Sequence, residues 1–173
     1  QSSALTERLL PYLAVSNRDA QKLVTVILTG VTAMVRGTAS EMEEKGITRP
    51  AEVIGDVTRQ ADILHISNEV PFAVDCKDPV PRLSGKLSFC SKDSYLELLE
   101  AVGTDIVELT GDHFQDWGEA ALEHTLQLYQ QKGWKYYGGG LNIEEAKQPV
   151  KLEINGTKIA FLGCNAKPTI YGN

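Results

Sequence analysis

The residues best suited to do chemistry lie in one short stretch near the middle of the chain. Asp112 and His113 are adjacent, and Asp116 follows three residues later. Carboxylate oxygens and an imidazole nitrogen together form a ligand mixture used by divalent metals that assist hydrolysis. The apolar run 106–109 precedes them and a helical pattern follows. We therefore expect a loop at the carboxyl end of a strand, where open α/β sheets place their sites.

Asp116 also allows a purely structural interpretation. With Glu119 it has the spacing of a capping box, in which side chains satisfy free backbone N–H groups at the start of a helix. The sequence leaves metal binding and capping open for Asp116. An isolated Asp-His pair is common on protein surfaces, so the functional interpretation depends on the other loops.

Two further loops carry polar residues after predicted strands. Arg36 follows an apolar run at 23–29, and Asn68 and Glu69 follow a second run at 61–67. Because the carboxyl ends of parallel strands meet at one edge of a sheet, we expect these loops to converge. Such a set suits hydrolysis of a phosphate ester, in which cations polarise phosphoryl oxygens and an arginine pairs with them. The expected roles are metal ligation by Glu69, Asp112, His113 and Asp116, catalysis by His113 and Asp112, and substrate binding by Arg36 and Asn68.

The composition restricts the class of protein. The chain has 173 residues, of which 42% are apolar and 23% charged, as expected for one globular domain with its own core. Its formal charge is -6 and it contains no basic run, which argues against nucleic acid as a partner. No stretch approaches the roughly 20 apolar residues of a membrane-spanning helix. We expect a small-molecule or polymer substrate instead.

The three cysteines lack the CxxC spacing of a zinc knuckle. Cys76 and Cys90 flank a loop that contains proline and glycine. They can form a disulfide if the protein works outside the cytoplasm, or remain two small buried thiols. Cys164 follows an apolar strand and is expected in the core.

Strands and helices alternate along the chain, which predicts an α/β fold with right-handed crossovers. The β-branched run Leu23–Thr29 is typical of a buried central strand in a parallel sheet. His65 is expected to be a structural residue, and His124 to be structural or exposed. Residues 1–20 are assigned to an N-terminal helix or linker and residues 21–173 to the domain. The further expected strands are at 61–67, 106–109 and 134–137, and a hairpin with Asn155-Gly156 as its turn follows them. The expected helices are one with a Ser40–Glu43 capping box that ends at Gly46, one from Pro50 that buries Val53, Ile54 and Val57, one around 95–102, one with Leu122, Leu126 and Tyr129 on one face, and one capped by Asn142. A loop is expected at 30–37 and irregular chain at 73–89.

Four ordered motifs resemble the CapA-type poly-γ-glutamate capsule biosynthesis proteins of the calcineurin-like metallophosphatase superfamily. They lie at residues 29–36, 67–71, 111–118 and 138–146. The resemblance implies a metallophosphatase-like mixed sheet flanked by helices, the N-terminal part of an αββα sandwich that is incomplete at its C-terminus. It also implies a divalent cofactor (Mn, Zn or Mg), an extracytoplasmic or cell-envelope location, and contact with membrane-associated capsule machinery. A partial sandwich would leave a sheet edge uncovered, so we also expect a homo-oligomer.

The chain departs from the family pattern at three places. Val31 stands where the family has a metal-binding Asp, Ser67 where it has an Asn, and Gly111 with Asp112 where it has paired Asn residues. Glu69, His113, Asp116 and Arg36 match the pattern. Two hypotheses follow. The protein is either a metal-dependent phosphatase-like hydrolase of capsule biosynthesis, or a non-catalytic binding or scaffold domain that has lost part of its metal site. A third interpretation, an α/β domain whose polar loops are only solvated, does not explain the four motifs.

Overall fold

The computed structural model of the protein describes residues 19–81 and 87–165. The helix expected near the N-terminus lies outside the described residues. The main sheet has four strands in the order β1-β2-β3-β4, and every pair is parallel. The strands of this sheet are β1 (Val26–Thr32), β2 (Ile63–Asn68), β3 (Ile106–Glu108) and β4 (Lys135–Tyr137). The α-helices are α2 (Arg36–Lys45), α3 (Ala51–Thr58), α4 (Leu96–Val102), α5 (Gly118–Gln131) and α6 (Ile143–Ala146). Two short 3-10 helices are η1 (Ala20–Lys22) and η2 (Asp93–Tyr95). The predicted α/β fold is confirmed.

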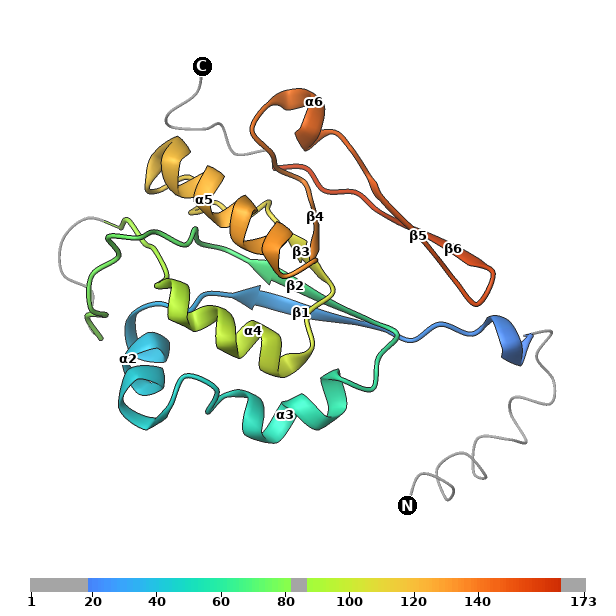
Figure 1. The fold of residues 1–173 in the computed structure, drawn as a ribbon, viewed down its shortest axis with the longest axis horizontal. Coiled ribbons are helices and arrows are strands. Elements are labelled where there is room, and N and C mark those ends of the chain that lie inside the picture. The colour runs from blue at the N-terminus through green and yellow to red at the C-terminus, as the bar shows by residue number, and fades with distance from the viewer. Residues whose placement is uncertain (1–18, 82–86, 166–173) are drawn as a thin grey trace.

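The two faces of the sheet are covered by different structures (Figure 1). Alternate residues of a strand point to opposite faces, so Leu64 and Ile66 of β2 pack with the helices. Ile63 packs on the other face, against a two-stranded antiparallel hairpin of β5 (Val150–Ile154) and β6 (Thr157–Phe161). The protein therefore has a helical layer, a parallel sheet and a hairpin layer.

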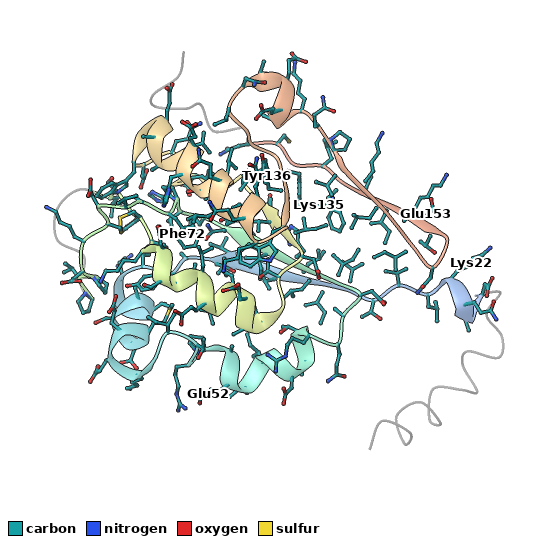
Figure 2. All side chains as sticks on the ribbon, in the orientation of Figure 1. Lys22, Glu52, Phe72, Lys135, Tyr136 and Glu153 are labelled. Atoms are coloured by element: carbon teal, nitrogen blue, oxygen red, sulfur yellow. A yellow bond between two sulfur atoms is a disulfide. The ribbon has the colours of Figure 1, made fainter. Side chains whose placement is uncertain are left out.

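The helical layer contains the larger core. Phe72 and Tyr129 are fully buried there, with their rings edge to face and their centroids 6.1 Å apart. In Figure 2, Phe72 lies in the interior between the helices and the sheet, whereas Glu52 and Glu153 lie at the surface. The predicted buried face of α5, which carries Leu122, Leu126 and Tyr129, is confirmed.

The hairpin layer has a small polar centre. His65 of β2 is buried, and its Nε2 lies 2.7 Å from the Tyr137 hydroxyl. Its imidazole stacks on Phe161 of β6, and burial lowers the pKa of His65. The expected structural role of His65 is confirmed. His124 of α5 is also structural, since its Nε2 lies 2.9 Å from both carboxylate oxygens of Asp93.

Several local signals are confirmed in detail. The hairpin turn has positive φ at Asn155 (52°) and Gly156 (71°), as a type I′ turn requires. The Asn142 side chain accepts a hydrogen bond from the Glu145 backbone N–H at 2.9 Å and caps α6. Gly103 ends α4 in the left-handed conformation. These features depend on neighbouring residues alone, which is why the sequence predicts them.

The prediction that the first strand is buried and central was wrong. β1 starts three residues later than expected, includes Gly30, and forms an edge of the described sheet. The side chains of Leu28 and Val31 are 64% and 69% exposed. The hairpin packs only on the start of this strand, through Val24 and Val26, so the apolar run extends past the structure that covers it.

The expected boundaries of the first helix were also wrong. α2 begins at Arg36, so its first turn replaces the end of the expected loop at 30–37. Ser40 and Glu43 lie inside the helix rather than at a capping box, and Val35 at the N-cap position offers no side-chain hydrogen bond. The predicted end at Gly46 is confirmed.

Two predictions of buried apolar residues were wrong. Val53, Ile54 and Val57 of α3 are exposed, and the helix buries Ala51, Gly55 and Thr58 instead. Cys164 is an exposed free thiol, not a core residue.

A groove of about 330 Å³ runs between the end of β1 and helices α3 and α4. The groove is largely apolar, and the expected metal ligands do not line it. Among the described residues, no helix is long and apolar enough to cross a membrane.

Candidate metal centre

Three of the four expected metal ligands come together at the carboxyl edge of the sheet. Glu69 directly follows β2, and Asp112 and His113 lie in the loop after β3. One ligand atom from each side chain lies within 4.8 Å of the other two. Two carboxylate oxygens and an imidazole nitrogen form a donor set suited to Mn²⁺, Zn²⁺ or Mg²⁺. Metal–ligand bonds of about 2 Å require these atoms to move somewhat closer together when a cation binds.

Glycine allows the two loops to approach so closely. A Cβ atom at Gly111 would lie 2.6 Å from Glu69 Cα and 2.9 Å from the Glu69 carbonyl oxygen. Both contacts are with backbone atoms, which cannot rotate away as a side chain can. Gly111 therefore lets the loop that carries Asp112 approach the backbone of Glu69.

The fourth expected ligand, Asp116, orients His113 instead of facing the other ligands. Its Oδ2 lies 2.7 Å from His113 Nδ1. A carboxylate oxygen accepts hydrogen bonds, so Nδ1 carries the proton and the lone pair of Nε2 is available to a cation. Nε2 lies 4.0 Å from Asp112 Oδ1. The capping-box interpretation of Asp116 was wrong, because α5 begins at Gly118 with Trp117 at the N-cap and no side-chain cap bond.

The site also perturbs the acidity of Glu69. Partial burial raises the pKa of Glu69, and a hydrogen bond with the Asp112 carboxyl group raises it further. The neighbouring His113 opposes this effect and lowers the pKa of Glu69. Two acidic side chains this close repel each other when both are ionised, and a cation bound between them removes that repulsion.

This raised pKa predicts a pH dependence of stability in the metal-free protein. The folded state holds the Glu69 proton more tightly than the unfolded chain, so the stabilising contribution is complete below the ordinary value of 4.5. It is lost as pH rises through the raised folded-state pKa. Denaturant unfolding in a chelator, measured between pH 4 and 8, should show this loss in the wild type. Glu69→Gln cannot ionise and should lack it, and an equal pH slope in both proteins would contradict the assignment.

The structure separates the two expected substrate-binding residues. Arg36 begins α2, and its guanidinium carbon lies 5.9 Å from the centre of the Phe89 ring. Asn68 is fully buried. Its amide donates to the Val70 carbonyl at 2.8 Å and to the Tyr129 hydroxyl at 2.7 Å. A substrate cannot reach Asn68 there, so we assign it a structural role and retain Arg36.

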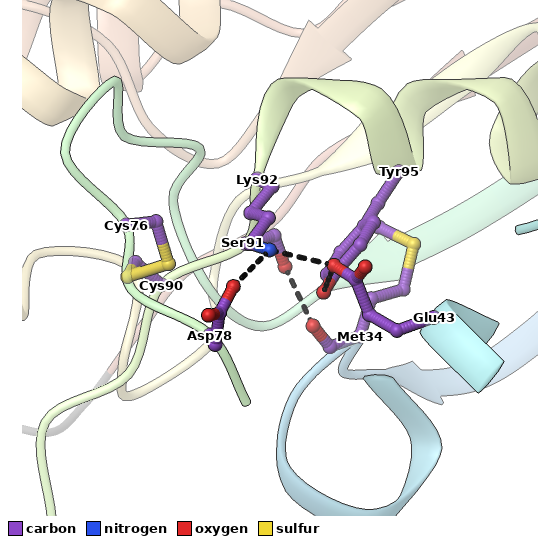
Figure 3. A network of polar contacts seen from close by, with 8 residues as sticks. All are labelled: Met34, Glu43, Cys76, Asp78, Cys90, Ser91, Lys92 and Tyr95. Atoms are coloured by element: carbon purple, nitrogen blue, oxygen red, sulfur yellow. Dashed lines mark hydrogen bonds and ion pairs between the residues drawn. A yellow bond between two sulfur atoms is a disulfide. The ribbon is translucent and has the colours of Figure 1, made fainter. Parts of the chain in front are cut away.

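Sequence reasoning missed the role of the segment Ser88–Lys92, whose first two residues were expected only as the end of the irregular stretch 73–89. Phe89 packs edge-on against the His113 ring, with their centroids 4.8 Å apart. Cys90 forms a disulfide with Cys76, which resolves the alternative left open by the sequence. Lys92 forms ion pairs with Glu43 and Asp78 (Figure 3). The cysteine pair was the only sequence signal for this structure.

Val31, which the resemblance places at a metal-binding position, contributes nothing to the cluster. Val31 pairs with Ser67 of β2 after a register shift in β1. Its side chain is exposed and has no atom that can bind a cation. The described site therefore offers one group of three ligands.

Comparisons with known proteins agree with the motifs. Residues 25–172 match the family model of the bacterial capsule synthesis protein PGA_cap. The chain is similar to the capsule biosynthesis protein CapA of Bacillus anthracis, with 22% identity over 158 residues. That alignment covers 91% of this chain but 38% of the Bacillus protein, so the chain spans well under half of that relative. Since the family model covers most of the chain, the protein belongs to the bacterial capsule synthesis (PGA_cap) family.

Proposed function

We propose that the protein is a metal-dependent phosphoesterase domain that acts in poly-γ-glutamate capsule biosynthesis. One observation supports this most strongly. Glu69, Asp112 and His113 gather their ligand atoms within 4.8 Å at the carboxyl edge of a parallel sheet. This is where α/β proteins place their sites, and a similar protein is a capsule biosynthesis protein.

Each residue has a distinct task in this proposal. Glu69 and Asp112 hold a divalent cation through carboxylate oxygens, and His113 holds it through Nε2. A bound cation supplies a Lewis acid that polarises phosphoryl oxygens. Arg36 presents a planar guanidinium, which can pair with two phosphate oxygens at once. Asp116 keeps the His113 ring in the required tautomer.

His113 cannot bind the cation and transfer a proton at the same time. Asp116 occupies its Nδ1, so Nε2 is the nitrogen that must serve either role. We assign His113 to cation binding, because a ring nitrogen of His113 lies within 4.8 Å of a carboxylate oxygen of both Glu69 and Asp112, and Nε2 lies 4.0 Å from Asp112 Oδ1. The catalytic role expected for Asp112 and His113 is therefore one of holding the cation.

Calorimetry and a turnover assay test the proposal directly. Mn²⁺, Zn²⁺ and Mg²⁺ are titrated separately into the protein, and hydrolysis of an aryl phosphate ester is followed with and without the bound ion. The proposal predicts saturable binding of one cation per chain and turnover that a chelator abolishes. Absence of binding for all three ions would overturn it.

The disulfide supports a location outside the cytoplasm. Structural disulfides persist in oxidising compartments and are rare in the cytosol. The bond between Cys76 and Cys90 therefore fits a protein that works at the cell envelope, alongside membrane-associated capsule machinery.

A second candidate function is a non-catalytic binding domain that retains the fold and part of the pocket. Val31 favours it, because a valine stands where the family has an Asp and removes one carboxylate from the site. The same experiments separate the two functions. Cation binding without any phosphoesterase turnover would favour the binding domain.

A further inference from the structure

The segment Ser88–Lys92 touches every loop that forms the candidate metal centre. We propose that Phe89 in this segment is a positioning residue for His113, and that the Cys76–Cys90 disulfide holds Phe89 in place. The inference rests on the proposed metal site for its functional meaning. Its structural part concerns the orientation and tautomer of the His113 ring, and the tautomer can be measured without a metal.

The first contact is between the Phe89 backbone and Asp116. The Phe89 N–H donates a hydrogen bond to Asp116 Oδ2 at 2.8 Å. The same oxygen accepts the His113 Nδ1–H at 2.7 Å. The Ser88 hydroxyl also reaches the Asp116 backbone carbonyl at 3.3 Å. The carboxylate that sets the His113 tautomer is thus itself oriented by the segment.

The second contact is through the Phe89 ring. Its edge-on packing against the imidazole, at an interplanar angle of 69°, limits rotation of His113 about its side-chain bonds. The ring also lies under the guanidinium of Arg36, at 5.9 Å. One aromatic ring therefore contacts both a metal ligand and the residue that would bind the phosphate group.

The segment is tied to the other loops by backbone hydrogen bonds. The Ser91 N–H donates to the Pro71 carbonyl at 2.9 Å, and the Ala73 N–H donates to the Ser91 carbonyl at 3.1 Å. The Ser91 hydroxyl donates to the Met34 carbonyl at 3.1 Å (Figure 3). These bonds join the segment to the loops that follow β1 and β2.

A covalent link and two ion pairs hold the residues that directly follow Phe89. Cys90, the next residue, is bonded to Cys76, close to the loop after β2. Lys92 Nζ lies 2.7 Å from Glu43 of α2 and 2.6 Å from Asp78 (Figure 3). The position of Phe89 therefore depends on the disulfide-linked segment rather than on the sheet.

Two variants test the proposal. Phe89→Leu keeps the backbone N–H and removes the ring, and the double variant Cys76→Ser with Cys90→Ser removes the disulfide. Tyr136→Leu is the matched control, because it removes another partly buried ring from a strand that lies away from the cluster. The first measurement is the pair of ¹⁵N chemical shifts of the His113 ring in metal-free protein.

We expect wild type and Tyr136→Leu to show the single tautomer protonated at Nδ1. Phe89→Leu should show a mixture of tautomers, because without the Phe89 ring the imidazole can rotate away from Asp116 Oδ2. The double variant should show the same mixture. Mn²⁺ affinity, measured by calorimetry, should fall about 10-fold in both, as is usual when a residue that orients a metal ligand is lost. If the double variant does not fold, Phe89→Leu decides alone.

The outcomes distinguish this inference from the proposed function. An unchanged His113 tautomer and unchanged Mn²⁺ affinity in Phe89→Leu would overturn the positioning role. If wild type binds no cation, the proposed function fails, and the tautomer measurement still decides whether Phe89 positions His113. An equal loss of affinity in Tyr136→Leu would show general destabilisation and would also overturn the inference.

Discussion

Replacing His113 with alanine is expected to weaken cation binding by a factor of about 100 or more and to abolish metal-dependent turnover. The substitution removes one of three ligand atoms and leaves Glu69 and Asp112 facing each other without a neighbouring imidazole. Loss of even an outer residue around a metal site typically costs about 10- to 100-fold in affinity, so loss of a ligand should cost more. Isothermal titration calorimetry with Mn²⁺ measures the change.

His124→Ala is the matched control for this prediction. His124 pairs with Asp93 of η2 and is not part of the ligand group. Its removal should leave Mn²⁺ affinity within about twofold of wild type. If His113→Ala retained full affinity but lost turnover, His113 would be a proton-transfer group and not a ligand, which would contradict the assignment made above.

Replacing Gly111 with alanine is expected to separate the two loops of the metal centre. The added Cβ would lie 2.6 Å from Glu69 Cα, so the backbone of one loop must move. Overpacking of this kind typically costs about 1–3 kcal/mol of stability. The movement also takes Glu69 away from Asp112, and we expect Mn²⁺ affinity to fall about 10-fold or more. Thermal unfolding and calorimetry on the same preparation measure both effects.

Gly37→Ala controls for the general effect of adding a methyl group. A Cβ at Gly37 meets nothing within 4 Å, and the residue lies in the first turn of α2. Alanine favours the helix over glycine, so this variant should be as stable as wild type or up to about 1 kcal/mol more stable. A Gly111→Ala protein that behaved like Gly37→Ala would show that the close approach is not needed.

Sequence patterns predicted the elements whose formation depends on local chemistry. The hairpin turn at Asn155, the cap at Asn142 and the stop at Gly103 each require a particular residue in a particular backbone conformation. Convergence of Glu69 with Asp112 and His113 was also predictable, because parallel strands place their carboxyl ends at one edge.

The remaining features depend on contacts between distant parts of the chain. The exposure of Leu28 was missed because an apolar run in the sequence shows which side chains are apolar, but not which other part of the chain covers them. The contact of Phe89 with Asp116 was missed because Phe89 comes from an unrelated stretch 27 residues earlier. Neither position carries a periodic or spacing signal that a single sequence could reveal.

The parallel arrangement of the sheet has a consequence for the order of folding. Parallel strands cannot be joined by a tight turn, so each pair forms only after a long crossover segment has closed. Glu69 and Asp112 follow neighbouring strands joined in this way, and such distant pairing is slow. A cation can therefore be held only after β2 and β3 have paired. It would slow unfolding of the finished protein without accelerating its folding.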